Sequence, residues 1–283
     1  MKLPITVVSI TYNEIFHIEN YIINILRYFD KVVIIDSGST DGTLEVLKKY
    51  KKVEVVYNYF KDFGSQWNFA IKYVQKKGGW SLKMDPDERM TDNLYSEIVQ
   101  FFDKNIDKKF THCSFKRRLW YLSKPINVKY EIVRLWISEK CTFTNNLVNE
   151  HPIIDGNKFK FNNFIEHLDS KSHHSWIHKQ NTYTSLEAIS LARDLNIKYE
   201  GDLKVKFILF AKRIFIFLPF YRNIYFIYCY IFKKSILSGY LGYSWSLNRV
   251  NLLTNIKDKY KEITFQKNKD KFIEKLIFEI NKK

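Results

Sequence analysis

Four short, largely apolar segments recur in the first 85 residues, and the first three are rich in β-branched residues. They cover 5–10, 31–36, 53–58 and 80–85. Such runs, when flanked by turn residues, are typical of buried strands. Three helices are expected between them, at 18–26, 43–50 and 65–74, the first with apolar residues at a spacing of three to four. Strands alternating with helices predict an α/β fold whose sheet is mostly parallel, with helices on its flanks.

The pattern loosens after residue 103. Segments 112–122 and 131–137 predict two further strands, antiparallel and joined by a loop at 122–130. A polar stretch with several histidines, 149–178, precedes a predicted helix at 181–195. We therefore expect an α/β domain over 1–200, with halves 1–103 and 104–200, and a helical region over 201–283.

Region 205–234 is apolar and aromatic, but charged residues and a proline interrupt it. The interruptions are Lys212, Arg213, Pro219 and Arg222. Without an uninterrupted stretch of about 18 apolar residues, a membrane-spanning helix is not expected. Two interpretations stay open. The helices lie on a membrane face with basic side chains at the headgroups, or they form a buried pair in a basic protein.

Composition narrows the class of protein. The chain has 283 residues, of which 46% are hydrophobic, and this excludes global disorder. Its three cysteines, Cys113, Cys141 and Cys229, are far apart and predict neither a disulfide framework nor a zinc site. A reducing, cytoplasmic location fits them. The N-terminus runs directly into a strand pattern, so no signal peptide is expected.

The net charge of +16 belongs to the second part of the chain. Residues 1–103 carry 13 Lys and Arg against 14 Asp and Glu, and residues 104–283 carry 33 against 16. From Leu203 to Lys257 there is no acidic residue, while nine basic residues lie among aromatic ones. Nucleic acid, anionic lipid or an acidic acceptor would each suit such a surface.

Polar clusters follow the predicted strands at their carboxyl ends. They are Thr11–Glu14, Asp36–Gly42 and Asp85–Glu88. Parallel α/β sheets bind ligands at this edge. A carboxylate at Asp36 would accept hydrogen bonds from a ribose hydroxyl or a base N–H. Asp41 is equally consistent with a turn that caps the next helix, and Asn13 and Glu14 with a helix start.

The Asp85-Pro86-Asp87-Glu88 cluster places three carboxylates within four residues, which repel one another unless a positive charge compensates them. Mg²⁺ or Mn²⁺ would do so, since these ions take carboxylate oxygens and keep positions open for phosphate. Asp85 and Asp87 are the expected metal ligands, and the metal would stabilise charge on a departing diphosphate. The alternative is a solvated turn.

Four segments in this order and spacing resemble the inverting glycosyltransferases of family 2. They are VVSITYNE, VVIIDSGSTDGT, FGSQWNFAI and WSLKMDPDERM. The resemblance is specific over 5–91 and looser over 131–250. Within the family it is closest to the branch of lipopolysaccharide-core β-1,4-glucosyltransferases, where an FGSQ-x-NFA segment, a D-x-DE cluster and a later RL motif recur.

This resemblance implies a nucleotide-binding, GT-A-like fold, a UDP-sugar donor, Mg²⁺ or Mn²⁺, and inversion at the anomeric carbon. It implies roles for residues as follows: Thr11, Asn13 and Glu14 contact the nucleoside, Asp36 the base, Gln66 and Asn68 the donor, and Asp85 and Asp87 the diphosphate and metal. Arg134 lies in a V-R-L-W segment and is suited to pair with a phosphate or a carboxylate, or to anchor its strand.

Direct displacement needs a general base on the sugar face opposite the leaving diphosphate. The related branch carries a V-H-E motif here, which reads Val148-Asn149-Glu150 in this chain. The resemblance therefore makes Glu150 the expected base. The motif's histidine is absent at 149, although His151 follows. Asp87 and Glu88 are the rival positions.

Four histidines, His167, His173, His174 and His178, suggest a metal site, but without cysteine or acidic partners at a convincing spacing zinc is not expected. Acceptor contacts or packing fit them better.

The function expected from all this is transfer of a hexose, most plausibly glucose, from a UDP-sugar to the inner core of lipopolysaccharide or lipooligosaccharide. The enzyme would work in the cytoplasm, in peripheral contact with the anionic inner face of the inner membrane. A polyprenyl-linked capsule or O-antigen intermediate is the alternative acceptor. A nucleic-acid-binding protein would suit the pI near 9.5, but it leaves the carboxylate cluster unexplained. The sequence predicts no oligomeric state.

Overall fold

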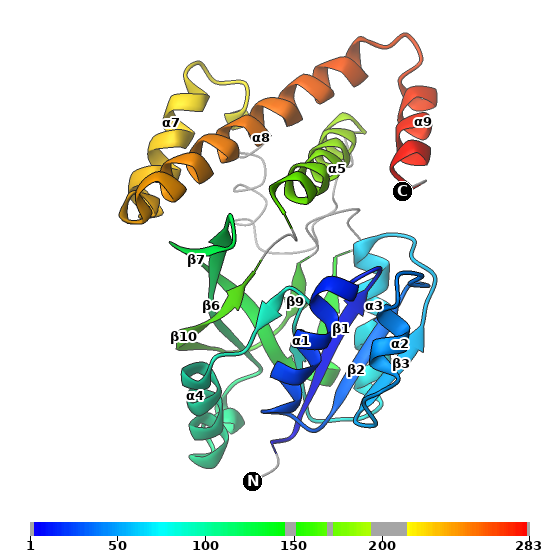
Figure 1. Ribbon diagram of the computed structural model, residues 1–283, viewed down its shortest axis with the longest axis vertical. Coiled ribbons are helices and arrows are strands. Elements are labelled where there is room, and N and C mark those ends of the chain that lie inside the picture. The colour runs from blue at the N-terminus through cyan, green and yellow to red at the C-terminus, as the bar shows by residue number, and fades with distance from the viewer. Residues whose placement is uncertain (1–2, 145–150, 169–171, 194–213, 282–283) are drawn as a thin grey trace. The chain divides into compact units, whose positions relative to one another are not determined.

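A computed structural model describes residues 3–144, 151–168, 172–193 and 214–281 (Figure 1). The chain forms two compact units. Unit 1 comprises Met1–Pro125 and Lys129–Lys171, and unit 2 comprises Ile126–Val128 and Ser172–Lys283. The division of 1–200 from 201–283 stays a prediction from the sequence.

Unit 1 is built on one sheet with the strand order β3-β2-β1-β4-β7-β6-β10-β5. The four strands predicted first are present as β1 (Ile5–Thr11), β2 (Val32–Asp36), β3 (Val53–Tyr57) and β4 (Trp80–Lys83). They pair in parallel, so their carboxyl ends lie at one edge of the sheet. The predicted α/β class with a mostly parallel sheet flanked by helices is confirmed.

The other half of the sheet is mixed. It contains β5 (Glu88–Arg89), β6 (His112–Tyr121), β7 (Lys124–Ile137) and β10 (Lys158–His167). The predicted antiparallel pairing of β6 with β7 is confirmed, and β7 also pairs antiparallel with β4. A separate two-stranded sheet joins β8 (Cys141–Phe143) to β9 (Pro152–Ile154).

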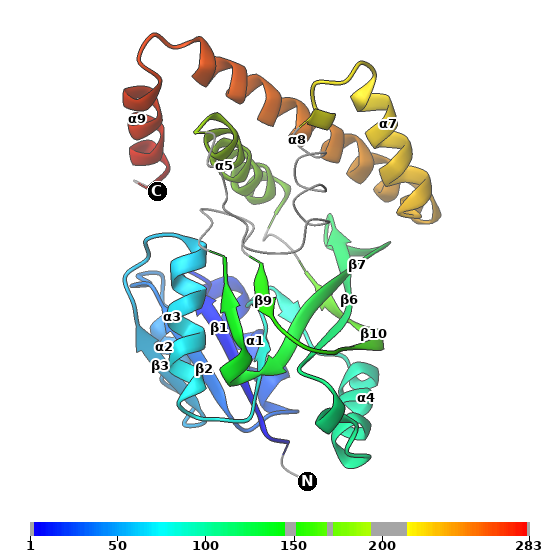
Figure 2. The same ribbon diagram turned by 180° about the vertical axis from the view of Figure 1, so that it is seen from behind.

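Helices cover both faces of the parallel strands (Figures 1 and 2). They are α1 (Ile15–Leu26), α2 (Thr43–Leu47), α3 (Phe63–Gln75) and α4 (Asp92–Asp103), with short 3₁₀ turns at Ile106–Lys109 and Ser138–Lys140. Alternate residues of one strand enter different cores. Val7 packs with α1 and α4, whereas Val8 packs with α3. Both faces are therefore buried, which explains why these strands read as continuous apolar runs.

Two expectations from the sequence are wrong. Most of the loop expected at 122–130 is strand, because the hairpin turns within two residues, Leu122 and Ser123, both at positive φ. The helix expected to begin at 181 is α5 (His173–Ala192), which begins eight positions earlier. The Ser172 hydroxyl caps it by accepting a hydrogen bond from Ser175 N at 3.1 Å.

Unit 2 is helical except for Ile126–Val128, three residues of β7. Besides α5 it has α7 (Tyr221–Ile227), a π-helical turn η3 (Tyr228–Phe232), a 3₁₀ turn η4 (Ser235–Ser238), α8 (Gly239–Phe265) and α9 (Lys269–Asn281). The Lys259 ammonium on α8 donates to Asn181 O and Thr184 Oγ1 at 2.8 Å each, which ties α8 to α5. None of the helices in the described residues is long and apolar enough to cross a membrane.

Candidate functional site

Asp36 orders the loop after β2. Its carboxylate is buried and accepts four hydrogen bonds from within the chain. Thr11 Oγ1 at 2.8 Å and Ser39 Oγ at 2.6 Å donate to Oδ2, and the backbone N–H groups of Gly38 and Ser39 donate to Oδ1 at 2.8 Å each. Two polar groups predicted to contact the nucleoside, Thr11 and Asp36, thus lie together. They also contact each other directly.

The loops after β1 and β2 interlock through further hydrogen bonds. Asn13 N donates to Ser39 Oγ at 2.8 Å, and Asn13 Oδ1 accepts from Thr40 N at 2.9 Å. Glu14 N donates to Thr43 Oγ1 at 2.9 Å. Asn13 adopts a positive φ of 56°, which Asn tolerates better than most residues. Since backbone amides are fixed by side chains of the opposite loop, the two loops form one rigid edge.

Asp41 belongs to the same edge. It accepts from Ile15 N at 3.0 Å and from the N and Oγ1 atoms of Thr43 at 3.0 and 2.5 Å. Although partial burial acts in the opposite direction, these hydrogen bonds lower the pKa of Asp41 below its ordinary value. Asp41 therefore orders the turn before α2, whose N-cap is Gly42 and not Asp41.

Gln66 and Asn68 lie on α3 but contact different elements. The Gln66 amide is buried, accepts from Asn58 Nδ2 at 2.7 Å and donates to Ser37 Oγ at 3.0 Å, so it supports the loop after β2. Asn68 pairs with the backbone of Phe143 on β8. Its Nδ2 donates to the carbonyl at 2.9 Å, and its Oδ1 accepts from the amide at 2.8 Å.

The Asp85–Glu88 segment forms a closed turn directly after β4. Glu88 N donates to Asp85 O at 2.9 Å, and Asp85 N donates to Glu88 Oε2 at 3.0 Å. The Glu88 side chain is fully buried, whereas the side chains of Asp85 and Asp87 are 30% and 13% exposed. Glu88 therefore holds the turn, and Asp85 and Asp87 are the two carboxylates of the cluster that a ligand would reach.

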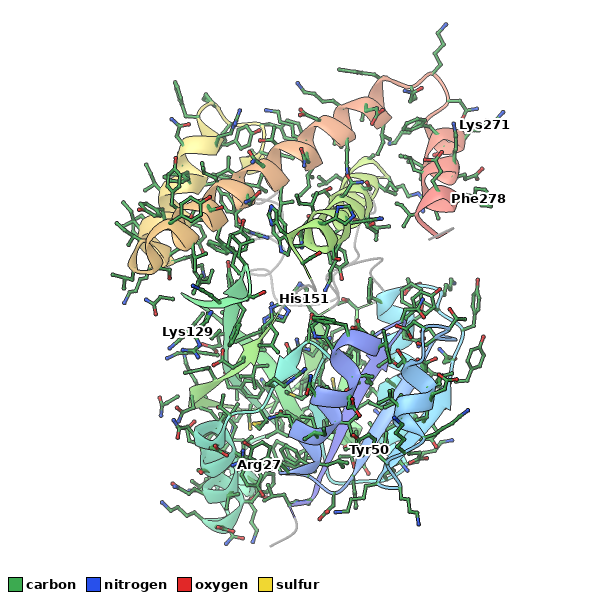
Figure 3. The ribbon with its side chains drawn as sticks, viewed as in Figure 1. Arg27, Tyr50, Lys129, His151, Lys271 and Phe278 are labelled. Carbon is green, nitrogen blue, oxygen red and sulfur yellow. The ribbon has the colours of Figure 1, made fainter. Side chains whose placement is uncertain are left out.

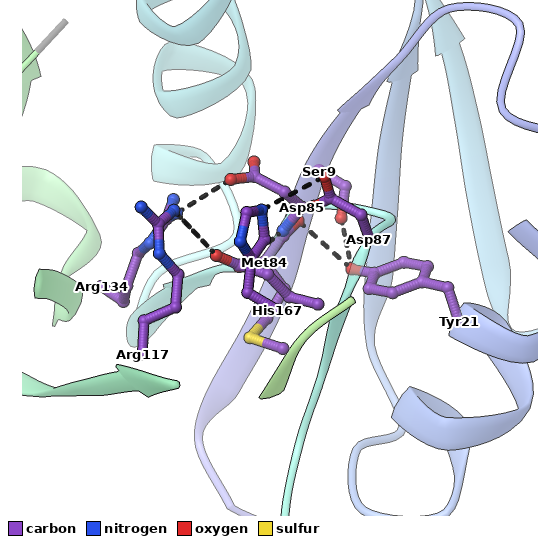
Figure 4. Close-up of polar contacts among 9 residues, drawn as sticks. Ser9, Tyr21, Met84, Asp85, Asp87, Arg117, Arg134 and His167 are labelled. Atoms are coloured by element: carbon purple, nitrogen blue, oxygen red, sulfur yellow. Dashed lines mark hydrogen bonds and ion pairs between the residues drawn. The ribbon is translucent and has the colours of Figure 1, made fainter. Parts of the chain in front are cut away.

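Arg134 on β7 bridges two of these carboxylates (Figure 4). Its Nη2 lies 2.8 Å from Asp85 Oδ2 and 2.8 Å from Glu88 Oε1. Arg117 on β6 adds a longer ion pair of 3.5 Å to the same Glu88 oxygen. Repulsion within the cluster is thus compensated by arginines of the chain. Charge compensation alone therefore does not require a metal ion.

The pKa values of Glu88 and Asp85 are shifted in opposite directions. Burial raises the pKa of Glu88 above its ordinary value, and the opposing charge of Arg134 does not cancel this. At Asp85 burial acts in the same upward direction, but Arg134 and then Lys83 outweigh it and lower the pKa. Lys83 is itself buried, with its ammonium 3.9 Å from the ring centre of Trp67. Of Asp85 and Glu88, Asp85 is therefore the carboxylate that stays ionised more easily.

Tyr21 fixes the end of β4 from the other side (Figure 4). Its hydroxyl is hydrogen-bonded to Ser9 on β1 and donates to Met84 O at 3.4 Å. The ring is fully buried, and burial raises the pKa of the hydroxyl, so it stays a neutral donor. The backbone that enters the carboxylate turn is thereby held to α1.

Asp87 faces His167, a residue distant in sequence. The two-residue strand β5 pairs antiparallel with the end of β10, opposing Glu88 to His167. Leu168 N also donates to Asp87 O at 2.8 Å. This pairing brings His167 Nε2 to 3.3 Å from Asp87 Oδ2. The sequence pattern groups His167 with the histidines at 173–178, which lie on α5, and it predicts neither this pairing nor the contact of Arg117.

A divalent ion at this turn would take few ligands from the chain. Among the described residues no group of three or more His, Cys, Asp and Glu side chains is placed to hold a metal. Asp87 Oδ2 and His167 Nε2 nonetheless have the separation of neighbouring ligands in an octahedral Mg²⁺ shell, which is about 3 Å. Mg²⁺ is commonly bound via one or two carboxylates plus substrate phosphates, and Asp87 supplies the carboxylate of this pair. The pair fits an ion that is completed by diphosphate and water.

The buried Nδ1 atom of His167 has no hydrogen-bond partner within the part of the chain that the structure describes. A ligating histidine is usually oriented through its second ring nitrogen.

Glu150, the base expected from the family motif, lies in the segment 145–150 outside the described residues.

The Glycosyl transferase family 2 model matches residues 6–152, more than half of the chain. An uncharacterized glycosyltransferase of Rickettsia prowazekii (strain Madrid E) is 23% identical over 200 residues, 65% of this chain and 66% of the relative. The lipopolysaccharide core biosynthesis glycosyltransferase LpsC of Rhizobium meliloti (strain 1021) is 30% identical over 102 residues, 35% of this chain and 36% of LpsC.

Among solved structures, TarS of S. aureus superposes with a TM-score of 0.41 at 14% identity, covering 88% of this chain and 55% of TarS. The chain thus spans slightly less than two thirds of the length of the rickettsial relative and about half of TarS. The closer assignment to the glucosyltransferase branch stays a prediction. The family expected from the sequence is confirmed, and the chain belongs to glycosyl transferase family 2.

Proposed function

We propose that the protein is an inverting hexosyltransferase that uses a UDP-sugar, with UDP-glucose as the first candidate donor. The observation that carries the proposal is the arrangement at the carboxyl end of β4. There Asp85 is fixed by Arg134, and Asp87 lies 3.3 Å from His167. The interlocked loops after β1 and β2 lie at the same edge of the sheet and form the nucleoside end of the donor site.

In this proposal Asp87 and His167 hold Mg²⁺ or Mn²⁺, with Asp85 directed at the same region. When bound, the ion stabilises the negative charge that develops on the departing diphosphate. The chain's own contribution is orientation. Arg134 fixes the Asp85 carboxylate at 2.8 Å, and the closed turn of Glu88 prevents the backbone from moving when the donor binds.

Transfer with inversion proceeds by direct displacement. The acceptor oxygen forms a bond to the anomeric carbon while the bond from that carbon to the diphosphate breaks. The acceptor proton passes to a general base on the opposite face of the sugar. In this proposal Asp85 and Asp87 serve the metal and the diphosphate, so neither is this base. We assign the role to Glu150 on the strength of the family motif.

The proposed acceptor is the inner core of lipopolysaccharide or lipooligosaccharide. It is supported by the partial match to LpsC, whose name assigns that relative to core biosynthesis. An anionic acceptor also suits the excess of basic residues over 104–283. The reaction would take place at the cytoplasmic face of the inner membrane.

The test is a donor and acceptor screen. Purified full-length protein is given several UDP-hexoses, with core oligosaccharide or a polyprenyl-linked oligosaccharide as acceptor, and UDP release is measured with Mg²⁺, Mn²⁺ or EDTA. We expect release with one UDP-hexose, dependent on the ion and on core oligosaccharide. Turnover only with the polyprenyl-linked acceptor would overturn the acceptor assignment. Release that is indifferent to EDTA would overturn the metal assignment.

A further inference from the structure

The hairpin between α7 and α8 exposes a group of large apolar side chains. They lie on η3, η4 and the first turn of α8 and are between 46% and 75% exposed: Ile231, Phe232, Ile236, Leu237 and Tyr240, here called the hairpin tip. Both views show α7 and the start of α8 meeting at this end of unit 2 (Figures 1 and 2). Many side chains project outward there (Figure 3). Exposed groups of this kind mark interaction surfaces.

The interior of the hairpin is filled by other residues, so the tip is not a loosened core. Ser235 Oγ donates to Gly242 O at 3.1 Å and is 2.8 Å from Ser246 Oγ. A Cβ at Gly242 would lie 1.7 Å from the Ser235 carbonyl oxygen, which shows how closely the backbones approach. Cys229 and Trp245 are buried beneath. The fold therefore holds the apolar residues outward on a rigid support.

The charged residues that neighbour the tip in the sequence are basic. Lys233 and Lys234 lie within it, and Arg222 and Arg249 lie on the adjoining helices. No acidic residue occurs from 203 to 257. Exposed apolar and aromatic side chains bordered only by basic ones match a bilayer surface, where the apolar groups enter the acyl boundary and the ammonium groups stay at anionic headgroups.

We propose that the hairpin tip inserts into the surface of an anionic phospholipid bilayer, with Phe232, Leu237 and Tyr240 as the inserting side chains. The inference deepens the proposed function, because a lipid-linked acceptor is presented at such a surface. It rests on that function only for its biological purpose, since lipid binding is measured without any sugar transfer.

The experiment is co-sedimentation of the full-length protein with vesicles of phosphatidylethanolamine and phosphatidylglycerol, compared with phosphatidylcholine alone. We expect strong binding to the first and weak binding to the second. Phe232→Ser with Leu237→Ser should lower the partition coefficient at least about tenfold. Replacing Lys233 and Lys234 by Gln should lower it about fivefold for each charge removed, in low salt. Phe232→Trp should retain binding.

The matched control is Phe265→Ser. Phe265 lies at the other end of α8 and is 78% exposed, against 72% for Phe232. It should leave binding unchanged within about twofold. An equal loss in this control, or binding that does not distinguish the two vesicle types, would overturn the proposal. A lipid-free dimer that the tip substitutions dissociate would also overturn it and assign the surface to a second copy of the chain.

The two proposals fail separately. Asp87→Ala should abolish UDP release while binding vesicles like the wild type. The tip variants should retain UDP release with a soluble core oligosaccharide. If the wild type transfers sugar to a soluble acceptor but does not bind vesicles, only the hairpin-tip proposal fails. If the wild type releases no UDP, only the proposed function fails.

Discussion

The Nε2 atom of His167 lies 3.3 Å from Oδ2 of Asp87, because the end of β10 pairs with β5, which comprises Glu88 at the end of the carboxylate turn and Arg89. This contact joins β10, the last strand of the large sheet in chain order, to the Asp85–Glu88 turn that follows β4. It also changes the basis of the metal assignment. Arginines compensate the charge of Asp85 and Glu88, so the case for a metal depends on Asp87 and His167.

His167→Asn should weaken metal-dependent donor binding. Removing one of two chain ligands is expected to raise the Mn²⁺ concentration needed for half-maximal UDP binding by about 10- to 100-fold. Calorimetric titration of UDP at several Mn²⁺ concentrations measures this without turnover. His178→Asn, on α5, is the control and should have no effect. Unchanged Mn²⁺ dependence in His167→Asn would remove His167 from the site.

Arg134→Met should destabilise the fold as well as the site. Glu88 is fully buried, and without Arg134 its charge loses its closest partner. Breaking a buried ion pair from one side costs about 3–5 kcal/mol. The double variant Arg134→Met/Glu88→Gln should recover part of this free energy of unfolding, measured in urea. If the double variant is less stable than Arg134→Met alone, Arg134 does not stabilise the fold by compensating Glu88.

The Asp36→Asn variant tests whether Asp36 acts by ordering the loop after β2 or by contacting the nucleotide base directly. The substitution replaces one of the two carboxylate oxygens, each of which accepts from two donors, by an amide NH2 group, so the free energy of unfolding should fall by about 1–3 kcal/mol. UDP affinity should fall with it, because the loop that carries the site is loosened. Asp30→Asn, an exposed partner of Lys52, is the control and should change neither quantity appreciably. Weakened UDP binding at unchanged stability would instead favour direct base contact.

The carboxyl-terminal edge of the parallel strands could be predicted because local signals define it. Val32–Asp36 is a continuous apolar run that ends in a carboxylate, and the buried strand Trp80–Lys83, although it includes Ser81 and Lys83, likewise leads into Asp85. Hydrogen bonding between the loops, such as Asn13 with Ser39 and Thr40, follows from placing two such ends on neighbouring strands. Local sequence is therefore sufficient to locate the carboxyl-terminal edge of the parallel strands, where we propose that the donor binds.

The partners from later strands were not predictable in the same way. Arg117 and His167 reach the carboxylate turn through the pairing of β6 with β7 and of β5 with β10. Arg134, which the sequence indicated as suited to a carboxylate, reaches it through the pairing of β4 with β7, but its two partners were not foreseen. Registers of this kind depend on the whole sheet and have no local signature. One error was avoidable. In the supposed loop, Ile126 and Val128 alternate with exposed residues, which is a strand pattern.

Glu131 should make stability depend on pH in acid. Hydrogen bonds from the ammonium groups of Lys160 and Lys158 lower its pKa to about 2, with partial burial opposing them and Ser114 adding to them. The unfolded value is about 4.3. A carboxylate whose pKa is lower in the folded state stabilises the protein above its unfolded pKa and loses this contribution as the pH falls through the folded pKa.

The difference in unfolding free energy between wild type and Glu131→Gln should therefore be constant from pH 7 to about 5 and shrink below about 4.3. It should stay below about 1 kcal/mol, because the lysine partners are exposed. Urea unfolding at a series of pH values measures it. A difference that grows as the pH falls would show that the lysines do not hold Glu131 ionised.

The most direct test of the central claim is UDP release by the Asp87→Ala variant. The wild type should release UDP from a UDP-hexose only with Mg²⁺ or Mn²⁺, and Asp87→Ala should lower the rate by at least about 100-fold. Asp103→Ala, at the exposed end of α4, is the control and should match the wild type. Normal turnover by a folded Asp87→Ala protein would contradict the assignment of the carboxylate turn to the metal and diphosphate.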